Sequence, residues 1–211
     1  MVNKRLGKIG AVVTGMSVTI FALDMILRLA IGYETAFASY FVCIFIAIGY
    51  VLLAASIAST QKNKQLAATG SAGIAFAVVY AILIFIVYYS MLTTVRMNSS
   101  LSDEALSIIK YEHLGSLFFN YNLLGYGFMG LSTFFIAYSV TPKSKGDRAL
   151  RILLRLHGVF FVACFIMPMF PVFTSDMEGG AIIGTLVLLV WCAYFFPICI
   201  LSWRYFKRRH G

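Results

Sequence analysis

The chain has 211 residues and a net charge of +9, and 61% of its residues are hydrophobic while only 12% are charged. A soluble domain usually carries about twice this charged fraction, and a chain of this size has too much surface to hide so many apolar side chains from water. Nucleic-acid binding is a poor explanation of the positive charge, because the basic residues are not gathered in one polar domain. The composition therefore predicts a membrane protein.

Six stretches reach the length of about 20 mostly apolar residues that a membrane-spanning helix needs. They cover residues 9–31, 36–57, 66–92, 114–140, 152–173 and 181–203. The runs are continuous, whereas the strands of a membrane barrel alternate between apolar and polar residues. The sequence thus predicts an all-α bundle of six transmembrane helices that forms a single domain over residues 1–211.

A polar segment separates the third and fourth spans. Ser102 followed by Asp103 and Glu104 is typical of a helix start, and apolar residues then recur on one face. We expect residues 101–113 to form a short amphipathic helix on the external membrane surface or on the helix ends. The alternative is a simple extension of the fourth helix.

The distribution of charge predicts the orientation of the chain. With six spans, one side carries the two tails, the loop after the second span and the basic loop after the fourth, which together hold these 14 of the 17 basic residues: Lys4, Arg5, Lys8, Lys62, Lys64, Lys143, Lys145, Arg148, Arg151, Arg155, Arg204, Lys207, Arg208 and Arg209. The other side holds Glu34, Asp103, Glu104, Glu112, Asp176 and Glu178, with Arg96 and Lys110. Because positive loops stay inside, both termini are predicted to be cytoplasmic.

Motifs for catalysis or cofactor binding are not found in the sequence. It contains no GxSxG, HExxH or phosphate-cradling GxxxxGKS pattern, and its histidines are too far apart in depth to share a metal. The four cysteines lie in apolar runs without CxxC spacing, which is typical of packing. We therefore expect no cofactor and no metal site, and the sequence favours a non-enzyme without deciding the question.

The most unusual residues are Asp24 and Arg28, which lie well inside the first apolar run. Asp24 is about seven residues from the external end, roughly 10 Å deep at helical rise. Acid and base four residues apart can pair on a helix surface, which would make them a self-neutralising pair. Ionisable groups within membrane spans are also candidate functional sites, because a charge there is costly. Both interpretations stay open.

Other polar and aromatic residues fall at the depth of this pair. We predict an outward-facing pocket lined from the first, third, fourth and fifth spans, with the second span mainly lipid-facing or structural. Its candidate ligand-binding residues are Asp24, Arg28, Tyr88, Asn120, Tyr121, Asn122 and Tyr126. The alternative is a set of interhelical hydrogen bonds and interfacial aromatic residues.

Residues 124–170 contain LGYGFMGLSTFFIAYSV, followed by a basic turn and RALRILLRLHGVFF. In these motifs the chain resembles small bacterial six-helix membrane proteins of unknown function. The resemblance implies the six-helix fold and transfers no activity and no site residue.

The sequence leads to one preferred function and two alternatives. The preferred function is the binding or transport of a small or amphipathic molecule by a multi-pass protein of the cell membrane, namely a bacterial cytoplasmic membrane. The first alternative is a non-catalytic accessory or scaffold subunit of a membrane complex, and the second is an intramembrane lipid-modifying enzyme. Expected partners are membrane lipids, a small-molecule ligand, and either further copies of the chain or another membrane protein, but no nucleic acid.

Overall fold

The computed structural model describes residues 2–32, 36–98, 100–170 and 180–208. All regular structure in these ranges is helical, so the predicted all-α fold is confirmed. The α-helices are α1 (Val2–Ile31), α2 (Ala36–Ala58), α3 (Ala67–Ser90), α4 (Asp103–Ile109), α5 (Leu117–Ile136), α6 (Lys145–His157), α7 (Val159–Ile166) and α8 (Gly180–Arg208). Shorter helical segments are η1 (Lys64–Leu66), the π-helical η2 (Met91–Val95), η3 (Ala137–Ser139) and η4 (Met167–Met169).

Five helical segments of the described chain are long and apolar enough to cross a membrane. They are Val2–Ile31, Ala36–Ala58, Lys64–Val95, Lys145–Met169 and Ile182–Arg208. The predicted span 114–140 is not among them, although it folds as α5 and η3. α5 is long enough, but Asn120, Asn122 and its glycines lower its hydropathy. The chain has the helices of a multi-pass membrane protein, and the sixth pass stays a prediction.

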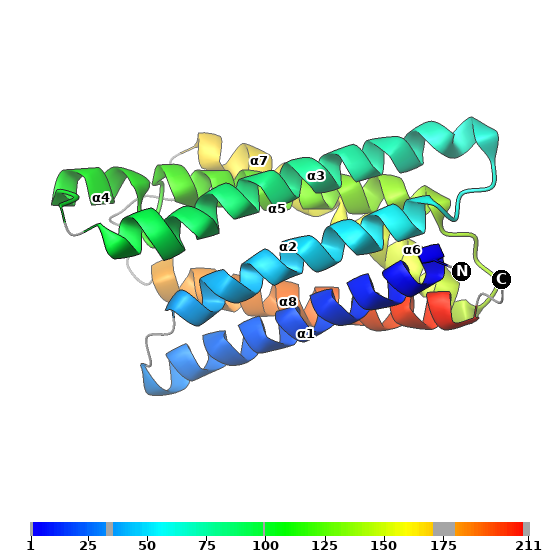
Figure 1. Ribbon diagram of the computed structural model, residues 1–211, viewed down its shortest axis with the longest axis horizontal. Helices are drawn as coiled ribbons and strands as arrows, with labels where there is room; N and C mark the ends of the chain where they lie inside the picture. The colour runs from blue at the N-terminus through cyan, green and yellow to red at the C-terminus, as the bar shows by residue number, and fades with distance from the viewer. Residues whose placement is uncertain (1, 33–35, 99, 171–179, 209–211) are drawn as a thin grey trace.

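Successive long helices lie side by side and alternate in direction (Figure 1). The start of α1 and the end of α8 meet at one end of the bundle, where Gly7 lies against the ring of Phe206. We call this end the terminal end and the opposite end, which carries α4, the α4 end. The acids Glu34, Asp176 and Glu178 and the tail residue Arg209 lie outside the described residues.

The core of the bundle is organised around α2. This helix packs on α1, α3 and α5, and Tyr50, Leu53 and Ile57 are fully buried. The structural role expected for α2 is thus present, and Phe37, Phe41 and Phe45 form an exposed apolar face on the same helix. Hydropathy alone does not separate a helix that faces lipid from one that faces other helices, because both are apolar.

Close contact between α1 and α2 depends on two glycines. A Cβ atom on Gly10 would lie 2.6 Å from the backbone nitrogen of Leu53, and one on Gly49 would lie 2.7 Å from that of Thr14. Both distances are shorter than side-chain carbons tolerate, so only glycine allows the two backbones to approach this closely. The crossing aligns the second half of α1 with the first turns of α2, which sets the geometry of the candidate site.

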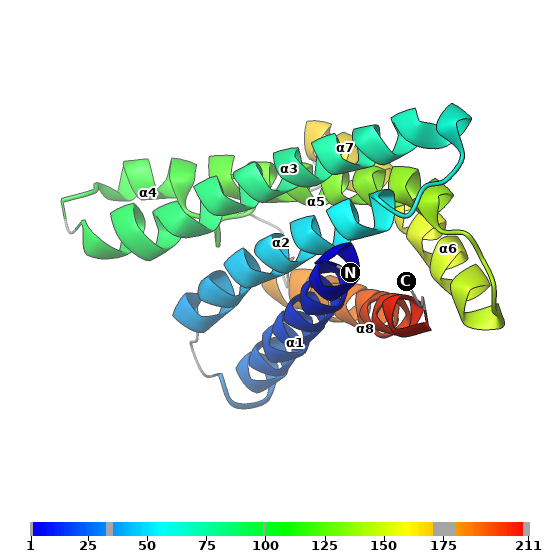
Figure 2. The same cartoon turned by 45° about the vertical axis from the view of Figure 1, so that its right-hand side comes forward.

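The basic stretch 143–155, expected as a loop, is mostly helix. α6 begins at Lys145, and the Ser144 hydroxyl caps it by accepting a hydrogen bond from the Asp147 amide at 3.2 Å. Leu150 and Leu154 on one face are buried, and Asp147 forms a 2.5 Å ion pair with Arg208 of α8. A search for uninterrupted apolar runs misses such a helix because its other face is charged. Figure 2 shows α6 crossing the terminal end of the bundle.

The predicted helix start at Ser102 is confirmed. α4 covers Asp103–Ile109, and the Ser102 hydroxyl accepts a hydrogen bond from the Ala105 amide at 3.2 Å. Residues 110–116 then form turns before α5 begins at Leu117, so α4 is not an extension of the following helix. Gly115 has a φ of +80°, a conformation that favours glycine, and it reverses the chain towards α5.

Candidate functional site

The most polar buried contact between α1 and α2 involves Asp24. Its side chain is 7% exposed, and its carboxylate accepts a hydrogen bond from the Ser39 hydroxyl of α2. Asp24 also lies within electrostatic range of Cys43, one turn further along α2. A buried carboxylate needs such a partner, because an isolated buried charge is costly. The close helix crossing at Gly10 and Gly49 therefore brings Asp24 together with Ser39.

Three tyrosines from different segments pack together beside this contact. Tyr40 of α2 stacks on Tyr88 of α3 with ring centroids 5.4 Å apart. Tyr111, which follows α4, meets Tyr40 edge-on at 5.8 Å and Tyr88 at 5.6 Å. We call Tyr40, Tyr88 and Tyr111 the tyrosine cluster. Such edge-on and offset contacts are the favoured geometries of aromatic rings.

Glu112 ties the segment after α4 to the bundle. The Tyr40 hydroxyl donates a hydrogen bond to the Glu112 carboxylate. The neighbouring Tyr111 is packed into the bundle, and this burial raises the pKa of its hydroxyl to about 12. Arg28 is half-buried, and its charge lies within electrostatic range of Tyr40 and Tyr111. The tyrosine cluster is therefore bordered by an acid from the α4 segment and a base from α1.

The four predicted site residues of α5 divide into two pairs. Asn120 donates a hydrogen bond to the Gly115 carbonyl at 3.0 Å, and Tyr121 is 38% exposed. Asn122 and Tyr126 are buried, and Tyr126 lies within electrostatic range of both Tyr88 and Tyr111. The structure thus brings Tyr126 to the tyrosine cluster, whereas Asn120 acts locally at the start of its own helix.

Several polar atoms near mid-bundle make no hydrogen bond of ordinary geometry. They include the hydroxyls of Tyr80 and Tyr126, whose rings are 5.6 Å apart, and the amide oxygen of Asn122. Buried polar groups are usually paired, and leaving one unpaired costs roughly 1–3 kcal/mol. The Tyr80 and Tyr126 hydroxyls interact only weakly with each other, and the amide oxygen of Asn122 has no hydrogen-bond partner among the described residues.

A second buried polar group, around His157, is fully satisfied by the protein. The indole nitrogen of Trp191 donates to Nε2 at 3.1 Å, and Thr133 Oγ1 lies 2.9 Å from Nδ1. Because the Thr133 hydroxyl donates to the Gly130 carbonyl, it accepts from the Nδ1 proton, so the imidazole is neutral. This histidine joins α5, α6 and α8 and has no free nitrogen for catalysis.

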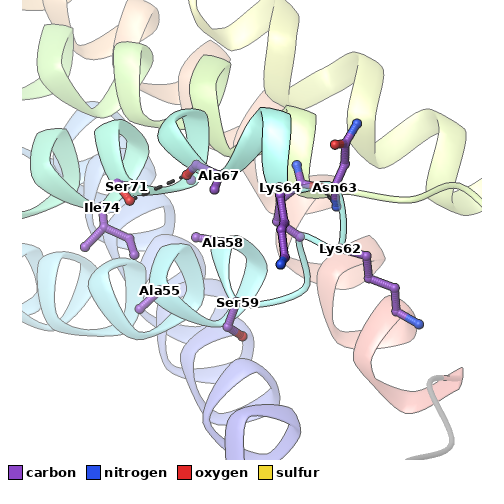
Figure 3. A pocket seen from close by; sticks show the side chains of 11 residues that line it. Ala55, Ala58, Ser59, Lys62, Asn63, Lys64, Ala67, Ser71 and Ile74 are labelled. Atoms are coloured by element: carbon purple, nitrogen blue, oxygen red, sulfur yellow. Dashed lines mark hydrogen bonds between the residues drawn. The ribbon is translucent and has the colours of Figure 1, made fainter.

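Neither of the two best-defined cavities of the described chain contains the tyrosine cluster. One of about 300 Å³ lies between α2 and α3 near the terminal end. Figure 3 shows Ala55 and Ile74 in its wall, with Lys62 pointing away from them. The other, of about 230 Å³, is an apolar groove between α1 and α8. The outward-facing pocket thus stays a prediction, and at its expected position the tyrosine rings pack on each other.

The described ranges contain no cluster of potential metal ligands. No three His, Cys, Asp or Glu side chains come together there to hold a metal ion. The four cysteines are free, and Cys43, Cys192 and Cys199 are buried, as expected for packing. Comparisons of the chain with protein-family models, curated proteins and solved structures found no match. The resemblance of residues 124–170 to small bacterial six-helix proteins stays a prediction.

Sequence reasoning missed four members of this site: Ser39, Tyr40, Tyr111 and Glu112. Ser39 and Tyr40 lie in a span that the sequence predicts to be apolar, although they are close to the expected depth of Asp24. The depth comparison applied to the other spans would have identified them. Tyr111 and Glu112 follow a solvent-exposed helix, and no sequence signal shows that this segment folds back onto α2.

Proposed function

We propose that the chain crosses the membrane six times with both termini in the cytoplasm. Support comes from the 14 basic residues on one predicted side and from the position of the start of α1 beside the end of α8 (Figure 1), as an even number of passes requires. The α4 end then faces outward. A reporter fused to the C-terminus should be active in the cytoplasm, and external activity would overturn this topology.

We further propose that the outward half binds or transports a small cationic or amphipathic molecule. The observation that carries this proposal is the tyrosine cluster beside the Asp24–Ser39 contact. Tyrosine faces attract cations, and a buried carboxylate supplies the opposite charge in surroundings of low dielectric constant. A lipophilic cation thus finds both kinds of partner within one site.

In this proposal, the segment after α4 closes the site. Tyr111 packs edge-on against both Tyr40 and Tyr88, where a ligand would bind, and Glu112 holds it there through Tyr40. When the segment moves away, the ligand replaces the Tyr111 ring and reaches towards Asp24. Arg28 balances the charge of Asp24 in the empty site, and Tyr126 and Asn122 supply polar contacts at greater depth.

Tetraphenylphosphonium and tetraphenylborate provide a matched test, because they have the same shape and opposite charges. We expect the cation to raise the melting temperature of the detergent-solubilised protein more than the anion does. Asp24→Asn should weaken cation binding at least tenfold, since loss of a desolvated charge partner costs more than about 1.4 kcal/mol. Asp103→Asn, an exposed acid on α4, is the control. Equal binding of both ions, or unchanged binding by Asp24→Asn, would contradict the proposal.

The alternative function is a non-catalytic accessory subunit. This function is favoured by the packing of Tyr111 on Tyr40 and Tyr88, because a segment with a purely structural role would make the same contacts. Isolation in mild detergent distinguishes the two functions. A stoichiometric membrane-protein partner, together with no response to either tetraphenyl ion, would support the accessory role.

A further inference from the structure

The groove between α1 and α8 lies on the outside of the bundle, and its lining is almost entirely apolar. Its floor consists of small buried residues: Ala11, Gly15 and Cys199. Its rim consists of larger exposed side chains: Val12, Met16, Phe196, Ile200 and Trp203. A Cβ atom on Gly15 would lie 3.2 Å from the Cβ of Cys199, so the glycine keeps the floor low. The shape suits a flexible hydrocarbon chain.

Basic residues lie at one end of this groove. On α1, Lys8 precedes Val12 by one helical turn, and on α8, Arg204 follows Ile200 by one turn. Lys207 follows Trp203 by one turn, and its ammonium group lies 5.0 Å from the centre of the indole ring. Because Gly15 faces Cys199 and Gly7 faces Phe206, the register of the two helices puts these cations at one level.

The acid described at this end of the bundle does not neutralise these cations. Asp147 lies on α6, and its carboxylate is engaged by Arg208 at 2.5 Å. The groove therefore has an apolar part about 10 Å long, from Phe196 to Trp203 at helical rise, and a positively charged end. This is the charge pattern of a phospholipid with an anionic headgroup.

We propose that the groove is a binding site for one anionic phospholipid. An acyl chain lies along Gly15 and Cys199, and the headgroup phosphate lies among Lys8, Arg204 and Lys207. Surrounding lipid tails are as apolar as the groove, so the groove accommodates an acyl chain by its shape but does not select one lipid over another. The cations supply the preference, and in the proposed topology they select lipid from the cytoplasmic leaflet, which is rich in anionic headgroups.

The test uses Trp203 as the reporter of occupancy. The sequence has two tryptophans, so Trp191→Phe leaves Trp203 as the single tryptophan, whose fluorescence is excited selectively over that of the tyrosines. The protein is reconstituted in phosphatidylcholine with increasing amounts of either phosphatidylglycerol or phosphatidylcholine that carries bromine on an acyl chain. We expect brominated phosphatidylglycerol to reach half-maximal quenching of Trp203 at a mole fraction at least tenfold lower than brominated phosphatidylcholine does. Equal quenching by the two lipids would overturn the proposal.

Two pairs of variants identify the cations responsible. Lys8→Gln with Arg204→Gln should reduce the preference by roughly tenfold or more, because each cation near an anionic headgroup contributes about fivefold. Lys62→Gln with Lys64→Gln removes the same charge from the α2–α3 loop and should leave the preference intact. An equal loss in both pairs would show general surface attraction and not a site.

A second measurement covers the case in which the first pair does not fold. Lys8→Gln alone should lose about a third of the preference on a logarithmic scale, since it removes one of three cations, and Lys8→Arg with Arg204→Lys should retain all of it. Native mass spectrometry of the unmodified chain should show one retained phosphatidylglycerol and no retained phosphatidylcholine. Retention of both lipids, or of neither, would refute the site.

Discussion

The hydrogen bond between Tyr40 and Glu112 is the contact whose loss should most clearly loosen the segment after α4. Tyr40→Phe removes the hydroxyl and keeps the ring that packs on Tyr88 and Tyr111. Glu112→Gln removes the charge with little change of shape. Either substitution should leave α4 and the long helices folded, because the bond joins only this segment to α2.

The free energy expected to be lost with this hydrogen bond follows from the burial of Tyr40 and the exposure of Glu112. A hydrogen bond to a charged group contributes about 1.5–3 kcal/mol, and the exposure of Glu112 places this one near the lower limit. About 1.5 kcal/mol corresponds to a roughly tenfold larger population in which the segment is detached. Lys110 immediately precedes Tyr111, so a protease that cuts after lysine reports this population.

The assay measures the initial rate of tryptic cleavage after Lys110 in the detergent-solubilised protein, by mass spectrometry. When cleavage is slow relative to reclosing, its rate follows the population of the open form. Each single variant should be cleaved about tenfold faster than the wild type. The double variant should also be about tenfold faster, because the same bond is lost only once.

Asp103→Asn is the matched control, because it removes an acid nine residues earlier that does not hold the segment on α2. Its cleavage rate should equal that of the wild type. A roughly hundredfold effect in the double variant would show that the two residues act independently. No change in any variant would show that ring packing alone holds the segment.

Three further results are expected. Gly49→Ala should destabilise the protein by about 1–3 kcal/mol and lower its melting temperature, because the new Cβ meets Thr14, whereas Gly184→Ala, which has nothing within 4 Å, should be neutral or slightly stabilising. Asp147→Asn should lower stability by about 1 kcal/mol at low salt, since its partner Arg208 is 47% exposed, and the difference should shrink at high salt. Burial raises the pKa of Tyr111 from about 10 to about 12, so the stability that its packing contributes should be fully present below pH 10 and be lost as the pH rises through 12. In a phenolate absorbance titration, Tyr111→Phe should lack one late ionisation that the wild type shows.

The sequence by itself determined that the chain is helical and suited to a membrane. Long apolar runs can satisfy their backbone groups in lipid only as helices, so five of six predicted spans coincide with suitable helices. The Ser102 cap was also predictable, because capping is a local property. α6 was not, because its helical character depends on a buried face that an apolar-run search does not detect.

Only the tertiary structure decided which polar residues meet. Asp24 was identified from the cost of a charge inside a membrane span, but its hydrogen bond to Ser39 depends on how closely α1 and α2 cross. Asn120 and Asn122 look equivalent in the sequence. In the structure, Asn120 donates a hydrogen bond to the carbonyl of Gly115 just before α5, whereas Asn122 is buried. Glu112 contacts Tyr40 of α2 across 72 positions of sequence, and no local pattern encodes such a contact.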